Sequence, residues 1–325
     1  MKFRTTLSIV LLPVTLLAAC APATTAVPAT EAPVQDVGTL KIAVLPIIDT
    51  LPMYVAEAEG LFAKYGVTIE FIPVASAPER DQLLAAGQAD GTINETLSVM
   101  MFNKDIVQMQ AVRYALRPVE GYGHFFILAS AKSGITDAQG LKGVEIGVSQ
   151  GTVIEYVTQR LLQAEGLTTD EIKTIAVPKI PDRMALLASG ELNAGVLPDP
   201  LASLAISQSA VKVLDDSLHP EYGFSVISFR KEVIDANPAA VKAFLAAIEE
   251  ASDLINLDAT KYTSLLSDKG LVPPPLLETF QVPPFPDQAV PTEAEWNDAL
   301  AWAKEKGMLS ADVSYADSVN ASLLP

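Results

Sequence analysis

The order of apolar and amphipathic segments is the feature that most constrains the fold of this chain. From residue 39 onward, short apolar runs typical of strands alternate with segments whose apolar residues recur at helical spacing. Such alternation builds mainly parallel sheets, because a helix must carry the chain back to the start of each next strand. The pattern therefore predicts an α/β fold.

The alternation occurs twice, as two successive β-α-β-α-β sets. Capping motifs of the S/T-x-x-E/Q type predict helix starts at Ser76 and Thr136, and Asn94 is expected to cap a further helix. The expected strands are residues 40–45, 68–74 and 91–93, then 125–129, 144–148, 172–177, 194–197 and 211–214. The expected helices within the sets include residues 52–64, 152–165 and 181–189.

The last hundred residues follow a different pattern. After a strand at 224–229 they predict a long amphipathic helix at 238–257 and another that opens at the capping motif of Thr292. The proline-rich passage 272–291 between them cannot be regular helix or inner strand. Because these helices need a surface to pack on, we expect them to return to the first β-α-β-α-β set.

The first twenty residues have the pattern of a targeting signal rather than of a folded segment. Lys2 and Arg4 precede a short apolar stretch, and Cys20, the sole cysteine of the chain, follows two alanines. This arrangement resembles the bacterial lipobox, in which the cysteine is lipidated and becomes the mature N-terminus. The alternative is an ordinary signal peptide that contains a cysteine. We expect a leader at 1–19 and a tether at 20–37, with the body outside the cytoplasmic membrane.

Composition excludes several partners. The net charge of -17 argues against binding to nucleic acid or to anionic lipid, both of which attract basic surfaces. One cysteine and two histidines leave no zinc site of familiar spacing. We therefore expect no metal and no cofactor, and contact with the membrane only through the lipid anchor.

Several segments resemble one known family. They are LPIIDTLPMYVAEAEGLFAKYGV, GVSQGTVIEYV, IPDRMALLASGELNAGVLPDPLAS and NPAAVKAFLAAIEEA. They resemble the extracytoplasmic solute-binding proteins of ABC importers, in the branch that binds nitrate, taurine, alkanesulfonates and thiamine precursors. The resemblance implies a two-lobe type II periplasmic-binding-protein fold with a ligand cleft, and it implies a non-enzyme. Expected partners are a small ligand and the importer's permease and ATPase, and the chain is expected to be a monomer.

The resemblance also implies where the lobes divide. Lobe 1 would hold residues 38–122 and 224–325, and lobe 2 would hold residues 123–223. The two crossing segments would lie near 121–123 and 222–223, where glycine permits a bend. A plain loop turn is the alternative for both segments.

Candidate ligand-binding residues follow from the rule that open α/β sheets bind ligands beyond the carboxyl ends of their strands. In the resembling family the same loops line the ligand site. The residues selected in this way are Ile48, Asp49, Tyr54, Ser76, Arg80, Asn94, Glu95, Ser149, Gly151, Thr152, Asp199 and Tyr222.

The chemistry of these residues points to two kinds of ligand. Acidic side chains such as Glu95 and Asp199 beside tyrosines favour a small amino-substituted heterocycle, for example a thiamine-type pyrimidine precursor. An alkanesulfonate, taurine or another anion is the runner-up, held by Arg80 and the helix start at Thr152. Gly151 would let the backbone approach such a ligand closely.

Two functions from other classes stay open. Residues 147–151 match G-x-S-x-G, the nucleophile elbow of serine hydrolases, which would need His219 as base and an acid such as Asp199. A sensory module that signals to a membrane partner is the other alternative. His124 and His219 are expected to be structural or surface residues.

Overall fold

The computed structural model describes residues 36–325, which belong to one compact unit. The predicted leader, Cys20 and nearly all of the predicted tether lie outside the described residues. Within 36–325, no helix combines the length and the apolar character that crossing a membrane requires.

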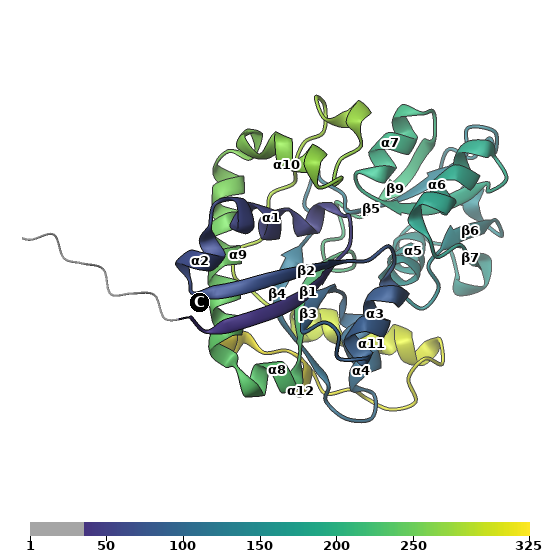
Figure 1. Cartoon of the computed structure of the whole chain (residues 1–325). Coiled ribbons are helices and arrows are strands. Elements are labelled where there is room, and N and C mark those ends of the chain that lie inside the picture. The colour runs from purple at the N-terminus through teal and green to yellow at the C-terminus, as the bar shows by residue number, and fades with distance from the viewer. Residues whose placement is uncertain (1–35) are drawn as a thin grey trace, which may run out of the picture. The chain divides into compact units, whose positions relative to one another are not determined.

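Two five-stranded sheets form the framework (Figure 1). The first sheet has the order β2-β1-β3-β10-β4 and the second has the order β7-β6-β8-β5-β9. The strands of the first sheet are β1 (Gly38–Val44), β2 (Val67–Pro73), β3 (Gly91–Asn94), β4 (Met109–Leu116) and β10 (Ser225–Arg230). Those of the second sheet are β5 (Phe125–Ala129), β6 (Glu145–Val148), β7 (Lys173–Ala176), β8 (Ala194–Pro198) and β9 (Val211–Asp215).

The two sheets share one topology, and it is less parallel than the sequence predicts. In the first sheet β1 pairs in parallel with β2 and β3, whereas β10 is antiparallel to β3 and β4. In the second sheet β6 is parallel to β7 and β8, whereas β5 is antiparallel to β8 and β9. The antiparallel strand is in each case the one by which the chain arrives from the other sheet. Each crossing segment therefore leads into the interior of a sheet.

Twelve α-helices accompany the strands in the described part of the chain. In the first half they are α1 (Leu51–Ala58), α2 (Leu61–Lys64), α3 (Ala77–Ala85), α4 (Thr96–Asn103), α5 (Val153–Ala164) and α6 (Ile180–Ser189). The others are α7 (Leu201–Ser207), α8 (Lys231–Ala236), α9 (Pro238–Leu257), α10 (Thr263–Asp268), α11 (Glu293–Glu305) and α12 (Tyr315–Ser318). The α/β fold class predicted from the sequence is confirmed.

Local signals predict most of these elements, and three of them mislead. The helix expected at 52–64 is broken at Gly60, which is left-handed with φ 69°. Asn94 lies in β3 and does not cap α4, whose N-cap is Glu95. No helix begins at Thr136, because only a short 3-10 turn at Gln139–Leu141 follows. The strand β4 is not among the strands predicted from the sequence. It is buried along its whole length, so it lacks the alternation of apolar and polar residues that marks a half-buried strand.

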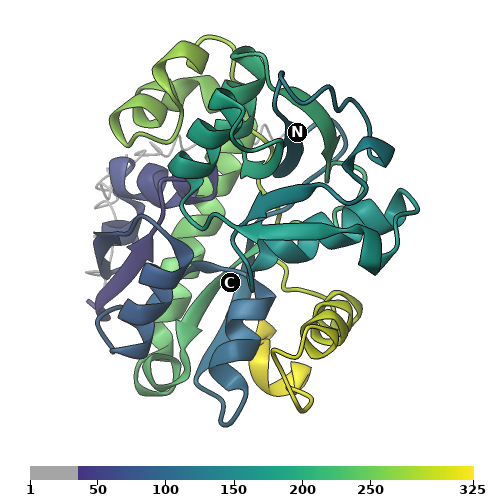
Figure 2. The same cartoon turned by 90° about the vertical axis from the view of Figure 1, so that its right-hand side faces the viewer.

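The C-terminal helices hold the structure together. Helix α9 packs on α1, α2 and β1, as expected for a helix that returns to the first set. Helix α11 packs on α4 and also reaches α5 of the second set, where the Trp302 Nε1–H donates to Gln159 and the Tyr156 hydroxyl donates to Asp298. Figure 2 shows α11, in yellow-green, below the teal strands of the second sheet.

The first turn of α11 gives a direct test of this packing. Thr292 and Glu295 form a complete capping box, in which each side chain accepts from the other residue's backbone N–H. We expect Thr292→Ala to lower the free energy of unfolding by about 1 kcal/mol, measured by urea denaturation. Thr136→Ala is the matched control, because the same sequence motif caps no helix there. An equal loss in both variants would contradict the assignment.

Candidate functional site

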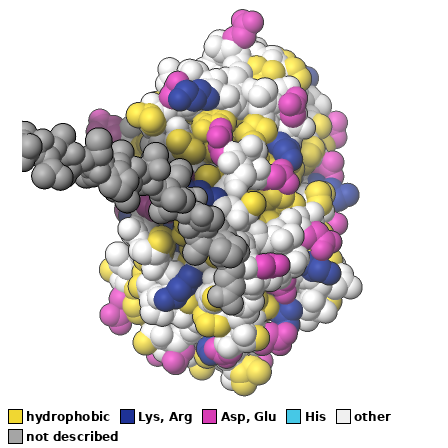
Figure 3. Space-filling view, turned by 60° about the vertical axis from the view of Figure 1, so that its left-hand side comes forward, with side chains coloured by type: hydrophobic (Ala, Val, Ile, Leu, Met, Phe, Trp, Pro, Cys, Tyr) yellow, Lys and Arg dark blue, Asp and Glu magenta, His cyan; other side chains and the backbone are white. Residues whose placement is uncertain are grey.

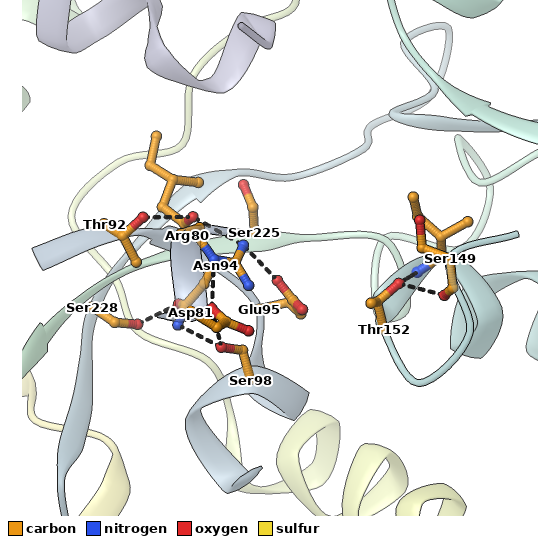
Figure 4. Close-up of polar contacts among 12 residues, drawn as sticks. Arg80, Asp81, Thr92, Asn94, Glu95, Ser98, Ser149, Thr152, Ser225 and Ser228 are labelled. Carbon is orange, nitrogen blue, oxygen red and sulfur yellow. Dashed lines mark hydrogen bonds and ion pairs between the residues drawn. The ribbon is translucent and has the colours of Figure 1, made fainter. Parts of the chain in front are cut away.

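A cavity of about 80 Å³ lies where the carboxyl ends of strands from the two sheets face each other. Apolar side chains form most of its wall, and it is called the polar cavity here after the buried polar groups that stand at its two sides. From the first sheet it is lined by residues at or just after the ends of β1, β2 and β3, and from the second by residues at or just after the ends of β6, β7 and β8. Figure 4 shows the two polar groups on opposite sides, with Arg80 and Glu95 on one side and Ser149 and Thr152 on the other. Its lining includes Asp49, Ser76, Arg80, Asn94, Glu95, His124, Ser149, Thr152, Pro178 and Pro198.

On the first-sheet side a chain of hydrogen bonds orders the buried Arg80. Its Nε donates to Asp81 at 2.8 Å and its Nη1 donates to Glu95 at 3.2 Å. Asp81 accepts in turn from the hydroxyl of Ser98, which accepts from Asn94 (Figure 4). The second terminal nitrogen of Arg80 has no partner within the described residues. This side of the cavity therefore offers one fixed, buried N–H donor, the second terminal nitrogen of Arg80, to which a ligand could bond.

Burial and charge oppose each other at this group. Burial raises the pKa of Glu95, and the neighbouring Arg80 cation lowers it by less, so the net direction is upward. Burial alone would lower the pKa of Arg80, but Glu95 and Asp81 raise it above its usual value. Arg80 is therefore charged at any physiological pH, and Glu95 holds its proton more tightly than an exposed glutamate does.

The second-sheet side is the start of α5. Thr152 is the N-cap, and its hydroxyl accepts from the N–H of Ile154 while donating to the carbonyl of Ser149. Gly151 is left-handed with φ 72°, and its N–H donates to the buried Glu155. Glu155 is also paired with Lys306 at 2.8 Å. The first turn of α5 thus faces the cavity with its positive dipole end.

A second arginine lies directly behind this side. Arg183 of α6 is fully buried, and its Nη1 donates to the Ser149 hydroxyl at 3.2 Å and to the Val177 carbonyl at 2.7 Å. Its Nε and its other terminal nitrogen have no partner within the described residues. Burial lowers its pKa to about 10, so it remains charged at neutral pH.

The edge of the cavity is a buried charge cluster around His124. Its Nε2 lies 3.2 Å from Asp49, an ion-pair contact, and its Nδ1 bonds the carbonyl of Gly223 at 2.6 Å. The backbone N–H groups of His124 and Phe125 both donate to Asp216. The three ionisable side chains come from the loop after β1, the segment before β5 and the segment after β9.

Mutual charge sets the protonation of this cluster. Burial alone would lower the pKa of His124, but Asp49 and then Asp216 raise it to about 9. Burial alone would raise the pKa of Asp49, but the His124 cation lowers it below its usual value. Burial raises the pKa of Asp216 to about 7, despite His124 and two backbone donors that lower it. At neutral pH the cluster therefore contains a charged imidazolium facing Asp49.

The structure brings together seven of the twelve residues proposed from the sequence. Those that line the polar cavity are Asp49, Ser76, Arg80, Asn94, Glu95, Ser149 and Thr152. Ile48 and Asp199 instead line a second cavity of about 320 Å³ on the other side of His124. Gly151 lines neither cavity, and neither do Tyr54 and Tyr222.

The two tyrosines are occupied by packing. Tyr54 contacts Phe71 edge-on at 5.2 Å, and the ammonium group of Lys269 lies 4.5 Å from its ring centre. Tyr222 stacks on His219 at 5.5 Å. A position one turn into a helix or just before a crossing segment therefore does not bring an aromatic ring into the cavity here.

The G-x-S-x-G motif has a packing explanation. A side chain at Gly147 would meet Leu192 at 2.5 Å, so this glycine makes room for the packing of Leu192 and Arg183. The Ser149 hydroxyl donates to the carbonyl of Pro178 and accepts from Arg183. Its hydrogen-bond partners within 36–325 include no histidine, and His219 contacts Glu221 instead. The base that a serine nucleophile needs is thus not in contact with Ser149.

Sequence reasoning missed His124 and Arg183 as site residues. The structural role expected for His124 agrees with its burial and its ion pair with Asp49, and His124 also borders both cavities. Arg183 lies on a predicted helix and carries no local signal of its role. Within the described residues no cluster of histidine, cysteine, aspartate or glutamate side chains is arranged to hold a metal ion.

Comparison with known proteins assigns the chain to a family. The family model of the NMT1-like family matches residues 35–265, more than two thirds of the sequence. The chain belongs to the NMT1-like family. This confirms the resemblance seen in the sequence, and the solved structures below confirm the fold.

Similar proteins include binding proteins named for nitrate and for alkanesulfonates, and a desulfurization enzyme shares the fold. The nitrate/nitrite binding protein NrtA of Nostoc sp. is 26% identical over 69% of this chain and 56% of its own length. This chain thus spans little more than half of that relative. The solved alkanesulfonate-binding protein SsuA of Xanthomonas axonopodis, bound to MOPS, matches with TM-score 0.73 at 18% identity over 87% of this chain and 98% of its own. The desulfurization enzyme DSZB matches with TM-score 0.66 at 16% identity, over 88% of this chain and 97% of its own.

The charge cluster predicts how stability depends on pH. The folded-state pKa of His124, about 9, lies above an unfolded value of roughly 6.5, so its contribution is complete below pH 6.5 and is lost as the pH rises through 9. The raised pKa of Asp216 acts in the same direction at lower pH. We expect the free energy of unfolding to fall by roughly 3 kcal/mol between pH 6.5 and pH 9.

His124→Gln should flatten this pH dependence and lower stability most at the acidic end, measured by urea denaturation at several pH values. His219→Gln is the control, because His219 is partly exposed and its charged contact is Glu221. A His124→Gln variant with the slope of the unchanged protein would show that the cluster does not titrate in this way.

Proposed function

We propose that this chain is the solute-binding component of an ABC importer. The observation that carries the proposal is the polar cavity, because its lining comes from strand ends of two separate sheets. A ligand in this cavity would contact both sheets at once. It would therefore stabilise whichever arrangement brings the sheets together, which is the form a transporter recognises.

The division into lobes belongs to this proposal. Lobe 1 would comprise residues 38–122 and 224–325, and lobe 2 residues 123–223, with the crossing segments near 121–123 and 222–223 as hinges. Gly121 has φ 87°, a conformation that favours glycine. Gly223 lies so close to the Asp216 carboxylate that an added side chain would overlap it. Both glycines therefore have local reasons to stay glycine.

The contacts in the cavity favour a compact anion over the amino-substituted heterocycle. Asp49 and Glu95 are already paired with His124 and Arg80, and Asp199 lines the other cavity. The donors that remain are the terminal nitrogen of Arg80 and the first turn of α5, with Arg183 behind it. A sulfonate or nitrate group suits such donors. The relatives named for nitrate and alkanesulfonate binding support this choice.

The amino-substituted heterocycle, such as a thiamine-type pyrimidine precursor, remains the second candidate ligand. The observation in its favour is the second cavity, where Asp199 lies with Tyr122, Phe126 and Phe280. Burial raises the pKa of Asp199, and both Ser203 bonds go to its Oδ1, so Oδ2 is open to an N–H donor. A ring with an amino group would match this lining.

The alternative functions have less support. Against a serine hydrolase, the partners of the Ser149 hydroxyl in residues 36–325 include no histidine. The likeness to DSZB nevertheless shows that this fold also occurs in an enzyme. A purified protein that hydrolyses esters in the wild-type form but not as Ser149→Ala would favour the hydrolase. A sensor would bind the same solutes, and a neighbouring gene pair for a permease and an ATPase would favour the importer.

Location follows from the N-terminus rather than from the described residues. We propose that Cys20 is lipidated and that residues 21–37 tether a monomeric body to the outer face of the cytoplasmic membrane. On the face of the body drawn in Figure 3, acidic and basic side chains are interspersed. The permease and the ATPase would be its partners, and no cofactor is required.

The ligand choice can be tested by isothermal titration calorimetry and thermal shift on residues 21–325. The panel holds nitrate, methanesulfonate, taurine, an aminopyrimidine and thiamine. We expect an anion to bind, and a ligand at about 100 times its dissociation constant to add about 2.7 kcal/mol of stability. Arg80→Lys should weaken anion binding about tenfold, since it keeps the charge but loses the free guanidinium nitrogen.

Arg160→Lys is the matched control, because Arg160 is paired with Asp298 and does not line the polar cavity. Binding of the aminopyrimidine alone would move the ligand to the second cavity and to Asp199. Absence of binding across the panel, with the protein folded, would contradict the solute-receptor proposal for these ligand classes.

The anchor can be tested separately. Expressed with its own leader in a bacterium, the chain should partition into the membrane fraction and incorporate labelled palmitate. Cys20→Ser should abolish both, and a Ser8→Ala change in the leader should leave both intact. Labelled palmitate in the Cys20→Ser protein would refute the lipid anchor.

A further inference from the structure

Arg183 is unusual among the arginines of the described chain. Every other arginine in residues 36–325 lies within 4 Å of a carboxylate, and Arg183 does not. It is nevertheless fully buried. An isolated charge in the protein interior is costly, and a well-packed apolar side chain in its place is often neutral or stabilising. A structural role alone therefore does not explain a charged group here.

Apart from the Ser149 hydroxyl, the contacts of Arg183 described here are to backbone or apolar groups. Its aliphatic stem packs over Gly147 and Gly195, where an added side chain would approach the stem to 3.5 Å and 3.4 Å. Its two hydrogen bonds come from a single nitrogen, Nη1, while Nε and the other terminal nitrogen are unpartnered. Burial alone accounts for its lowered pKa, with no acidic neighbour contributing.

The guanidinium of Arg183 lies behind the cavity wall, with the Ser149 hydroxyl between it and the cavity. Ser149 lines the polar cavity and accepts from Arg183, so a ligand that touches Ser149 is separated from the cation by that hydroxyl alone. The other charges around the cavity are paired. Asp49 faces His124, Arg80 faces Asp81 and Glu95, and Glu155 faces Lys306. Among the buried charged side chains at this cavity in residues 36–325, Arg183 is therefore the one left without a counter-charge.

We infer that Arg183 is a specificity-determining residue that selects a negatively charged ligand, acting through Ser149 from behind the cavity wall. The inference rests on the proposed solute-binding function. An anion beside Ser149 supplies the counter-charge that the fold lacks, whereas a neutral ligand of equal shape does not. At roughly 6 Å and an effective dielectric constant near 20, two unit charges change an affinity by about a hundredfold.

The test compares methanesulfonate with dimethyl sulfone, a neutral compound of similar shape, by calorimetry. Arg183→Met should lose between about tenfold and a hundredfold in methanesulfonate affinity and should leave sulfone affinity unchanged. In the absence of ligand its thermal midpoint should rise, because an unpaired buried charge is removed. Arg183→Lys should keep most of the preference for methanesulfonate over the sulfone, since the charge remains.

Ser149→Ala and Arg160→Met are the controls. Ser149→Ala removes the hydroxyl but keeps the charge, so it should retain part of the preference for the anion. Arg160→Met removes a carboxylate-paired arginine from α5 and should leave the preference intact.

Each remaining outcome decides the matter. Unchanged sulfonate affinity in Arg183→Met, or an equal loss for both compounds with a lower thermal midpoint, would overturn the inference and leave the solute receptor standing. Failure of both Arg183→Met and Arg183→Gln to fold would also overturn it, because the guanidinium would then be structural. Wild-type protein that binds neither these two compounds nor any member of the wider panel would instead overturn the proposed function itself.

Discussion

The contact between His124 and Asp49 is the interaction on which the arrangement of the site depends. Asp49 belongs to the loop after the first strand of one sheet, and His124 immediately precedes the strand that enters the other. Asp216 and the Gly223 carbonyl bring the return segment to the same point. Charges that are buried together are costly to separate, so this contact holds the strand ends of both sheets at a fixed place. The polar cavity and the second cavity both border His124.

Helix α11 provides a second connection, of a different kind. Its contacts to α5 combine an indole–amide bond, a tyrosine–carboxylate bond and the stacking of Tyr156 edge-on against Trp302 at 5.6 Å. The buried residues around it form one continuous apolar cluster with parts of both sheets. The site thus lies between an ionic connection at the crossing segments and a connection at the C-terminal helices that combines apolar packing with hydrogen bonds. Any movement of one sheet relative to the other must therefore either pivot on one of these two connections or break it.

Local patterns in the sequence predict the strands well, and the rule about strand ends then locates most of the polar cavity. That rule cannot distinguish neighbouring residues. Asp49 lines the polar cavity and Ile48 the second one, and Pro198 and Asp199 are divided between the two cavities in the same way. His124 and Arg183 escape detection for another reason. The Asp216 partner of His124 is 92 residues away and Ser149 is 34 residues from Arg183, and no local pattern reports such distant contacts.

Hydrogen exchange measured by mass spectrometry, with and without the best-binding anion, tests most directly whether one ligand engages both sheets. The account predicts that binding slows exchange together in the segments around Arg80 and Glu95 of the first sheet and around Ser149 and Thr152 of the second. The crossing segment at His124 should be protected with them. Protection confined to the segments of one sheet, or located around Asp199 and Phe280 instead, would contradict the account.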